Sequence, residues 1–339
     1  MKKITVVFLI LFAVSGCVKL EKEDMNQVQI SQNKVTHHFG RHSIDIPAEF
    51  VLSDEVTAVF EPVRASEADA RLVLNVTVLK SNATLVEFKR KILSRESEIK
   101  ASARARTGIL KEVRRLSETV VIFRIQKINQ AYISELHQYL DGHYVRVSAD
   151  SYNNQFETVE AEIVNFLKNL KNNKSDPGRG SDYRLGELGV SGRYSQESSQ
   201  FLFRSVEHPD VVFTLRSNTY VPDSEETLLE RVDGPRSLLK IFDANNKVIR
   251  SREFQIASMK AQEWLSWIIL GGGDKSQKQY GFALETMRLH PSPLLPQIHL
   301  ELDTGQPDAT GAARPLTLGE PQIINLWDAT VSSIRHSAQ

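Results

Sequence analysis

The chain has 339 residues, of which 42 are Lys or Arg and 42 are Asp or Glu, so its formal net charge at pH 7 is zero. This balance offers no electrostatic footprint for nucleic acid, because nucleic-acid-binding domains carry a basic excess. The length predicts two domains of about 150 residues. With a single cysteine the chain can form no internal disulfide, so each domain depends on its own apolar core.

The first seventeen residues predict a secretory signal. They read M-K-K-I-T-V-V-F-L-I-L-F-A-V-S-G-C, a basic start followed by an apolar run that ends in small residues. The run is shorter than the roughly 20 apolar residues that a membrane-spanning helix needs. Val14-Ser15-Gly16-Cys17 matches the lipobox of bacterial lipoproteins, in which the cysteine thiol takes the lipid. We therefore expect a signal peptide over residues 1–16 and lipidation of Cys17; the alternative is an ordinary signal with a chance cysteine.

The lipid would hold the mature chain in the periplasm, attached to a membrane. Loss of Lys2 and Lys3 with the signal leaves 40 basic and 42 acidic residues. Val18 follows the cysteine, and the absence of Asp at this position favours the outer membrane. More than one acyl chain is enough for stable anchoring. Residues 17–34 are polar and predict a flexible tether between the lipid and the fold.

Residues 35–171 predict an N-terminal domain of strands and two helices. Thr84-Leu85-Val86-Glu87 is a capping box that starts a charged helix of about 20 residues. A second amphipathic helix is expected from about Gln155 to Leu170. Alternating or β-branched segments predict strands at 42–46, 57–63, 71–79, 113–116, 119–128, 131–140 and 144–149.

Residues 172–182 read N-N-K-S-D-P-G-R-G-S-D and predict a linker, because they contain Pro and Gly and no apolar residue. Residues 183–339 then predict a C-terminal domain. Asp223 to Glu226 would cap a short helix, and Pro321 would begin the last one. Strands are expected at 211–215, 238–242, 248–256, 264–270, 280–289 and 297–302.

Each half thus predicts an α+β domain with a mainly antiparallel sheet, because most connections are too short for parallel crossovers. The two halves share an order of elements that is compatible with a duplication, although their residue identity is too low to establish one.

A search for catalytic residues finds no complete constellation. Gly189-Val190-Ser191-Gly192-Arg193 resembles a nucleophile elbow, but Arg193 stands where that motif needs Gly. We interpret Ser191 as part of a turn. The triplet Gly271–Gly273 lacks the Lys-Ser/Thr of a phosphate loop and predicts a flexible hairpin.

Histidines offer no recognisable metal site either. His37, His38 and His42 have no carboxylate or Cys ligand at a known spacing, and we expect them to be solvated. His137 and His143 flank a hairpin turn, where neither spacing nor neighbours demand a ligand.

Two acidic residues are interpreted as structural. Glu285 is expected at the surface, and Glu263-Trp264-Leu265 is expected to anchor a packing contact. No nucleophile, base and orienting group come together in the sequence. We therefore predict no catalytic residue, metal or cofactor, and a binding protein rather than an enzyme.

The C-terminus carries a family resemblance. Ile324-Asn325-Leu326-Trp327-Asp328 with Ser332-Ser333-Ile334-Arg335 resembles the closing helix of immunity lipoproteins that protect against type VI secretion lipase effectors of the group-four phospholipase class. Shorter segments fit the same family: Gly40-Arg41-His42 with Ile46-Pro47, Leu228 to Arg231, Gln262-Glu263-Trp264 and Phe282 to Glu285. The chain departs from the family pattern at Leu284-Glu285 and in its final residues, His336 to Gln339.

The resemblance implies a two-domain clamp that is not an enzyme. Such a protein would grip a lipase effector in the periplasm and block the access of substrate. A structural or assembly lipoprotein of the envelope, with no toxin partner, is the alternative from a different class. A lipid- or glycan-active enzyme without a recognisable site is the third.

Overall fold

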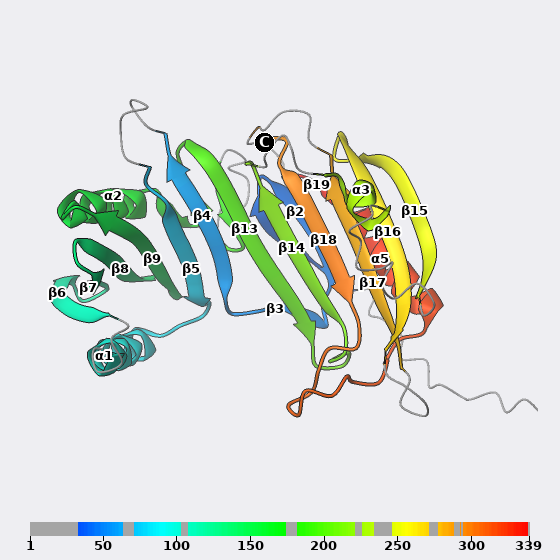
Figure 1. Cartoon of the computed structure of the whole chain (residues 1–339), viewed down its shortest axis with the longest axis horizontal. Coiled ribbons are helices and arrows are strands. Elements are labelled where there is room, and N and C mark those ends of the chain that lie inside the picture. Colours follow the sequence, from blue (N-terminus) through cyan, green and yellow to red (C-terminus); the bar gives the residue numbers. More distant parts are fainter. Residues whose placement is uncertain are drawn as a thin grey trace, which may run out of the picture.

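The fold is described from a computed structural model of the whole chain (Figure 1). The structure describes residues 33–63, 71–102, 108–173, 182–220, 226–233, 246–270, 277–287, 292 and 294–337. Several sequence predictions lie outside these ranges: the signal peptide, Cys17, the triplet Gly271–Gly273, most of the linker and the strand expected at 238–242.

An antiparallel sheet of thirteen strands extends across the whole width of the molecule (Figure 1). Its strands are, in spatial order, β15 (Asn246–Ile256), β16 (Met259–Leu270), β17 (Gln277–Thr286), β18 (Gln297–Asp303), β14 (Val212–Asn218), β13 (Tyr194–Ser205), β4 (Val56–Pro62), β5 (Leu74–Lys80), β9 (His143–Tyr152), β8 (Ala131–Leu140), β7 (Val120–Ile128) and β6 (Ile109–Ser117), with β3 (Phe50–Leu52) paired to β13.

A smaller sheet packs behind the middle of the large one in the view of Figure 1. Its order is β10 (Leu170–Asn172), β12 (Leu188–Val190), β11 (Tyr183–Leu185), β1 (Lys34–Gly40), β2 (His42–Pro47) and β19 (Arg335–His336). Phe39 on β1 packs edge-on against Phe201 on β13, with ring centroids 6.4 Å apart. The hydroxyls of Tyr183 on β11 and Ser199 on β13 form a hydrogen bond of 2.7 Å. These contacts join the two sheets through one apolar core.

Four helices with described bounds flank the sheets: α1 (Leu85–Ser102), α2 (Phe156–Lys168), α3 (Leu228–Asp233) and α5 (Glu320–Val331). The predicted capping box of α1 is formed: Glu87 Oε2 accepts the Thr84 amide at 2.8 Å, and the Thr84 hydroxyl accepts the Glu87 amide at 3.2 Å. Helices α2 and α5 pack on the face of the large sheet that bears the smaller sheet, whereas α1 and α3 lie on the opposite face.

The core follows from strict alternation along the strands. On β13, Phe201 and Phe203 are 1% and 0% exposed, whereas Gln200 and Arg204 are exposed. Successive side chains of a strand point to opposite faces of the sheet. Trp327 of α5 is fully buried against the same face, with its ring 5.8 Å from that of Phe282 on β17. The apolar face therefore points toward the smaller sheet, α2 and α5.

The structure confirms the α+β class and the mainly antiparallel pairing. It also contains the long strand β13, which the sequence analysis did not predict, and β1, which begins at Lys34. Both sheets take strands from both sides of the expected linker, since β13 pairs with β4 and β11 pairs with β1. The division at 172–182 stays a prediction, but the halves that flank it share their sheets and one core.

Candidate functional site

Within the residues that the structure describes, one face of the large sheet carries no second layer between α1 and α3. The register of the strands gives a row of directly paired residues that crosses this face. Because directly paired residues of neighbouring strands lie on one face, the row defines its position. The row runs Arg146, Thr77, Thr57, Gln200, Arg216, His299, Glu285. We call this row, together with the residues two positions before and after each of its members on the same strand, the open face.

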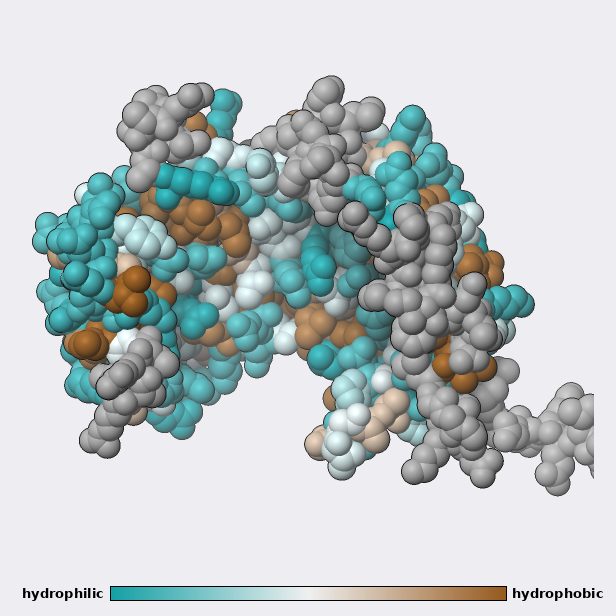
Figure 2. Space-filling view, in the orientation of Figure 1, coloured by the Kyte–Doolittle hydropathy of each residue, from teal (hydrophilic) through white to brown (hydrophobic). Residues whose placement is uncertain are grey.

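The open face is polar and hollowed. In the space-filling view, the middle of the molecule is hollowed and coloured mostly hydrophilic, with hydrophobic patches beside it (Figure 2). Gln200 and Thr57 at its centre are exposed, and Leu202 is half-buried. The same strands place apolar residues on the other side, where they form the core with the smaller sheet, α2 and α5.

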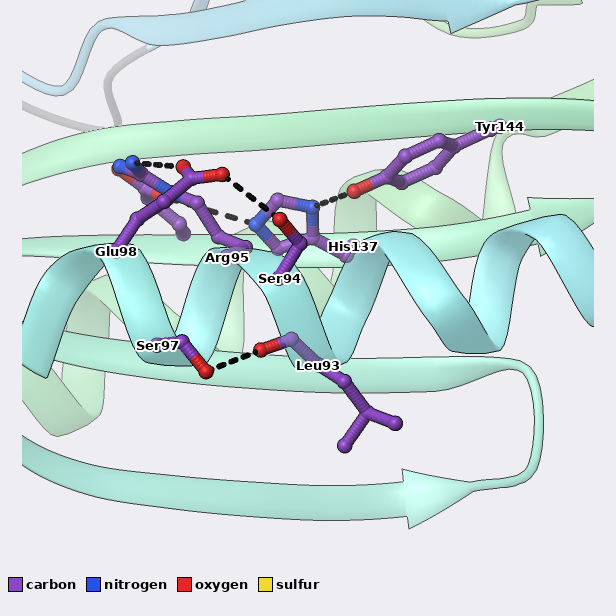
Figure 3. A network of polar contacts seen from close by, with 8 residues as sticks. Leu93, Ser94, Arg95, Ser97, Glu98, His137 and Tyr144 are labelled. Carbon is purple, nitrogen blue, oxygen red and sulfur yellow. Dashed lines mark hydrogen bonds and ion pairs between the residues drawn. The ribbon is translucent and has the colours of Figure 1, made fainter.

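At the α1 end, a buried polar network supports the open face (Figure 3). His137 Nδ1 lies 2.7 Å from the Tyr144 hydroxyl, and its Nε2 lies 3.4 Å from Glu135 Oε2. Arg95 of α1 donates to both oxygens of Glu135, at 3.0 and 2.6 Å. This arrangement ties the helix to the strand below it.

The protonation states of the network follow from burial and pairing. Burial lowers the pKa of His137, so the ring is neutral at pH 7. A neutral ring can donate from Nε2 to Glu135 and accept the Tyr144 hydroxyl on Nδ1. Burial alone would raise the pKa of Glu135, but hydrogen bonds from His137 and Arg95 outweigh it and hold that pKa at about 2. Glu135 is therefore an ionised, fully engaged carboxylate.

At the α3 end, Glu285 holds the short helix on the sheet. It accepts from Arg231 of α3 and from the side-chain amide of Gln297 on β18. Gln262 on β16 accepts the backbone N–H of Leu229 at 3.0 Å. Only 6% of Glu285 is exposed, so its expected surface position is wrong. It is buried because α3 covers it and Arg231 supplies the compensating charge.

Strand β18 contributes a short acidic segment to the open face. His299 Nε2 lies 2.8 Å from Glu301, and Arg216 on β14 lies 3.9 Å from the same carboxylate. A hydrogen bond from His299 lowers the pKa of Glu301. Asp303 is half-buried, and burial, with the charge of Glu301, raises its pKa to about 6. Within the described residues Asp303 has no ion-pair partner.

The residues singled out in the sequence do not form a catalytic site. Ser191 donates to the backbone oxygen of Asn169 at 3.2 Å, as expected of a turn. His42 is fully buried, and its ring lies tilted against that of His336 with centroids 4.5 Å apart; burial lowers its pKa to about 3. His37 packs edge-on against Phe203. The expectation that these histidines are solvated is therefore wrong for His37 and His42, because the β1–β2 hairpin packs against β13.

Glu263 and its neighbours pack as predicted. Glu263 is fully buried and accepts the Trp327 indole N–H at 2.7 Å and the guanidinium groups of Arg250 and Arg252. It thus joins α5 to β15 and β16. No group of three His, Cys, Asp or Glu side chains in the described ranges could hold a metal ion.

The C-terminal part of the chain matches a known family. Residues 187–338 match the family described as "Tle cognate immunity protein 4 C-terminal domain". These residues belong to that family. The match includes β13, β14, β17 and β18, which are four of the seven strands that carry the row, as well as α3 and α5. No curated protein matches the sequence.

Solved immunity proteins share the fold of almost the whole chain. The apo structure of TplEi, a type VI secretion immunity protein from Pseudomonas aeruginosa, has a TM-score of 0.62 at 19% identity, covering 90% of this chain and 98% of that one. TplEi complexed with "L" peptide gives 0.60 at 19%, covering 91% and 99%. The Tle4–Tli4 complex contains a chain with a TM-score of 0.63 at 19%, covering 90% and 97%. The N-terminal half, which the family match does not include, therefore has the fold of these proteins as well.

Proposed function

We propose that this protein is an immunity protein that binds a type VI secretion lipase effector and inhibits it without turning over any substrate. The observation that carries the proposal is the match of residues 187–338 to the Tle cognate immunity protein 4 family. The shared fold of the whole chain with immunity proteins, one of them in a Tle4–Tli4 complex, supports it further.

The open face is the surface proposed to meet the effector. Six strands from β5 to β17, about 4.8 Å apart and with roughly seven residues of about 3.3 Å each, give an area of about 550 Å² before side-chain relief is counted. A standard interface buries about 800 Å² on each partner. The inner sides of α1 and α3 flank the open face and would add to this area, so a partner seated there would be held from both ends.

The absence of turnover is part of the proposal. An inhibitor needs complementarity and no reacting group, and the polar side chains described above serve the fold: Glu285 is engaged by Arg231, and Ser191 by a backbone oxygen. Inhibition would follow from covering the effector so that lipid cannot enter its active site.

The proposed location is the periplasm, with Cys17 lipidated and anchored to the outer membrane. The lipobox and Val18 support this location. No helix in the described ranges has the length and apolar character that crossing a bilayer requires. A periplasmic inhibitor would neutralise a phospholipase where that enzyme attacks the membrane.

The test is co-expression with a Tle4-type lipase effector directed to the periplasm of a sensitive host. Survival only when the full chain is present, together with a complex on a sizing column, supports the proposal. Equal killing with and without the protein, and no complex, would reject it and favour the structural lipoprotein. Two phospholipase assays separate inhibition from enzymatic activity. The protein alone should release no fatty acid from phospholipid, and its complex with the effector should release none either.

A further inference from the structure

A pocket of about 430 Å³ opens beside α1 at one end of the open face. Its walls come from one side of α1 and from strands β5, β8 and β9. Lys91 and Arg95 of α1, Lys80 of β5 and Arg146 of β9 are among the residues that line it. The pocket therefore lies outside the residues 187–338 that match the immunity-protein family.

Cations outnumber carboxylates around the pocket. Its lining includes five cationic residues, Lys80, Arg90, Lys91, Arg95 and Arg146, and three carboxylates, Asp54, Glu87 and Glu98. A fourth carboxylate, Glu135, accepts hydrogen bonds from Arg95. Counting Glu135, the site retains one excess positive charge.

The pairing of these groups shows which cations are available. Lys80 lies 2.8 Å from Glu87, and Arg95 is engaged by Glu135 and Glu98. In the described part of the chain, Arg90, Lys91 and Arg146 form no ion pair. Arg146 donates instead to the Thr77 hydroxyl at 3.3 Å. An Arg so placed keeps most of its guanidinium donors for a ligand.

The base of the pocket is rigid and partly apolar. His137 and Tyr144 line it and are held by the network with Glu135 (Figure 3). Phe88 and Ala83 are 1% and 6% exposed and supply apolar surface. The pocket thus joins a cationic rim to a short apolar wall.

We propose that this pocket binds a phosphate ester, with the phosphate on Arg146, Lys91 and Arg90 and the carbon portion against Phe88 and Ala83. A guanidinium matches the geometry of two phosphate oxygens, and an ammonium adds a point charge. The volume lies within the roughly 300–1,000 Å³ of small-ligand pockets and exceeds what a bare carboxylate would fill. The ester can come from a lipid headgroup or from a soluble molecule such as glycerol 3-phosphate; both present the same chemistry.

The experiment uses residues 18–339, which include every described residue but neither the apolar signal segment nor Cys17, so that no anchor can by itself bring the protein to a membrane. Glycerol 3-phosphate and inorganic phosphate are titrated by calorimetry at pH 7 and low salt. Co-sedimentation is measured with phosphatidylcholine vesicles and with vesicles that also contain phosphatidylglycerol. The variants are Lys91→Gln, the double change Lys91→Gln with Arg146→Gln, and Lys89→Gln as a control. Lys89 lies on the same helix but pairs with Glu118 and does not line the pocket.

Saturable binding of glycerol 3-phosphate that weakens roughly tenfold or more in the double variant, and stays unchanged in Lys89→Gln, supports the proposal. Lys91→Gln alone changes an exposed side chain and should weaken binding to a lesser degree while leaving the fold intact. Binding seen only with phosphatidylglycerol vesicles, with the same dependence on the variants, identifies a lipid headgroup as the source of the ester.

The proposal is overturned if no phosphate probe binds saturably, or if Lys89→Gln and the double variant lose binding equally. It is also overturned if the unsubstituted protein binds no phosphate ester and the double variant no longer neutralises the effector. The pocket would then contact the protein partner instead of a phosphate ester. Failure of neutralisation by every protein, with phosphate binding retained, would instead reject the proposed immunity function and leave the pocket in place.

Discussion

Replacement of Trp327 by Ala should cause a large loss of stability, because this side chain joins α5 to the large sheet. Trp327 is fully buried, packs on Phe282 and donates to a buried carboxylate of Glu263 at 2.7 Å. Truncation of a buried Trp costs about 3–5 kcal/mol. That is a large share of the roughly 5–15 kcal/mol that stabilises a typical domain.

Two further variants separate packing from hydrogen bonding. Trp327→Phe keeps most of the ring but removes the N–H donor, and a hydrogen bond to a charged group contributes about 1.5–3 kcal/mol. Leu93→Ala is the control: it shortens an apolar side chain on α1 that is 62% exposed, so it should change the free energy of unfolding by no more than about 0.5 kcal/mol. A loss of about 3–5 kcal/mol corresponds to a fall in melting temperature of roughly 6–15 °C.

The assay is urea unfolding followed by circular dichroism, supported by thermal melts. The order of stability should be Leu93→Ala, then Trp327→Phe, then Trp327→Ala. If Trp327→Ala unfolds at the same urea concentration as the unsubstituted protein, the side chain does not support the fold. If Trp327→Phe loses as much as Trp327→Ala, the hydrogen bond to Glu263 accounts for the whole effect and the packing argument is wrong.

Three further predictions follow from other parts of the chain. The pKa of Asp303 is raised to about 6 in the fold, so ionisation of this carboxyl destabilises the folded state at pH values above 6 and has almost no effect below the ordinary pKa of 3.8. Asp303→Asn should therefore stabilise the protein by up to roughly 3 kcal/mol at pH 7.5 and by almost nothing at pH 3.5. An equal gain at both pH values in urea unfolding would contradict this. Cleavage at a protease site inserted within 174–181 should leave both halves in one particle on a sizing column, because β13 pairs with β4; separation without denaturant would refute the shared sheet. Cys17→Ser should abolish labelling by radioactive palmitate, and equal labelling of both proteins would exclude Cys17 as the lipidated residue.

Local patterns predicted most elements of the fold. The Thr84–Glu87 capping box and the apolar spacing of α2 located two helices within a few residues of their bounds. Strands β7 and β8 were also recognised because both are rich in apolar and β-branched residues. These signals are local, so they can be read without knowledge of the tertiary structure.

The central strand β13 was missed although its inward residues alternate. Its segment Tyr194–Ser205 combines Phe201 and Phe203 with Ser and Gln residues that resemble a loop. Ser198 and Gln200 lie on the open face, whereas Glu197 and Ser199 are polar although they face the smaller sheet, so the usual alternation of apolar and polar residues is hidden. The continuity of the sheet through β13 and β4 is also invisible locally, because it depends on pairing between residues more than 130 positions apart.

The candidate site was even less predictable than the fold. The sequence indicated a binding protein but no binding residue, because the open face is assembled from strands on both sides of the expected linker. His42 and Glu285 were placed at the surface because polar residues usually lie there. In the structure the rings of Phe39 and His336 pack against His42, and Arg231 with α3 covers Glu285. Such partners come from distant segments, so only the fold reveals them.

The central claim is that the open face binds and inhibits the effector. Gln200→Lys places a charge at the exposed centre of this face, and Asn165→Lys places the same charge on the exposed surface of α2, on the opposite side of the sheet. Neither change touches the core, so both variants should retain the stability of the unsubstituted protein. They differ only in which side of the molecule carries the new charge.

The decisive measurement is the titration of each purified protein into the phospholipase assay of a Tle4-type effector. One equivalent of the unsubstituted protein or of Asn165→Lys should abolish lipid hydrolysis, whereas Gln200→Lys should inhibit roughly tenfold or more weakly, because a charge buried without a partner at an interface costs several kcal/mol. Full hydrolysis in the presence of excess unsubstituted protein would contradict the immunity function. Equal inhibition by Gln200→Lys and Asn165→Lys would place the effector elsewhere than on the open face.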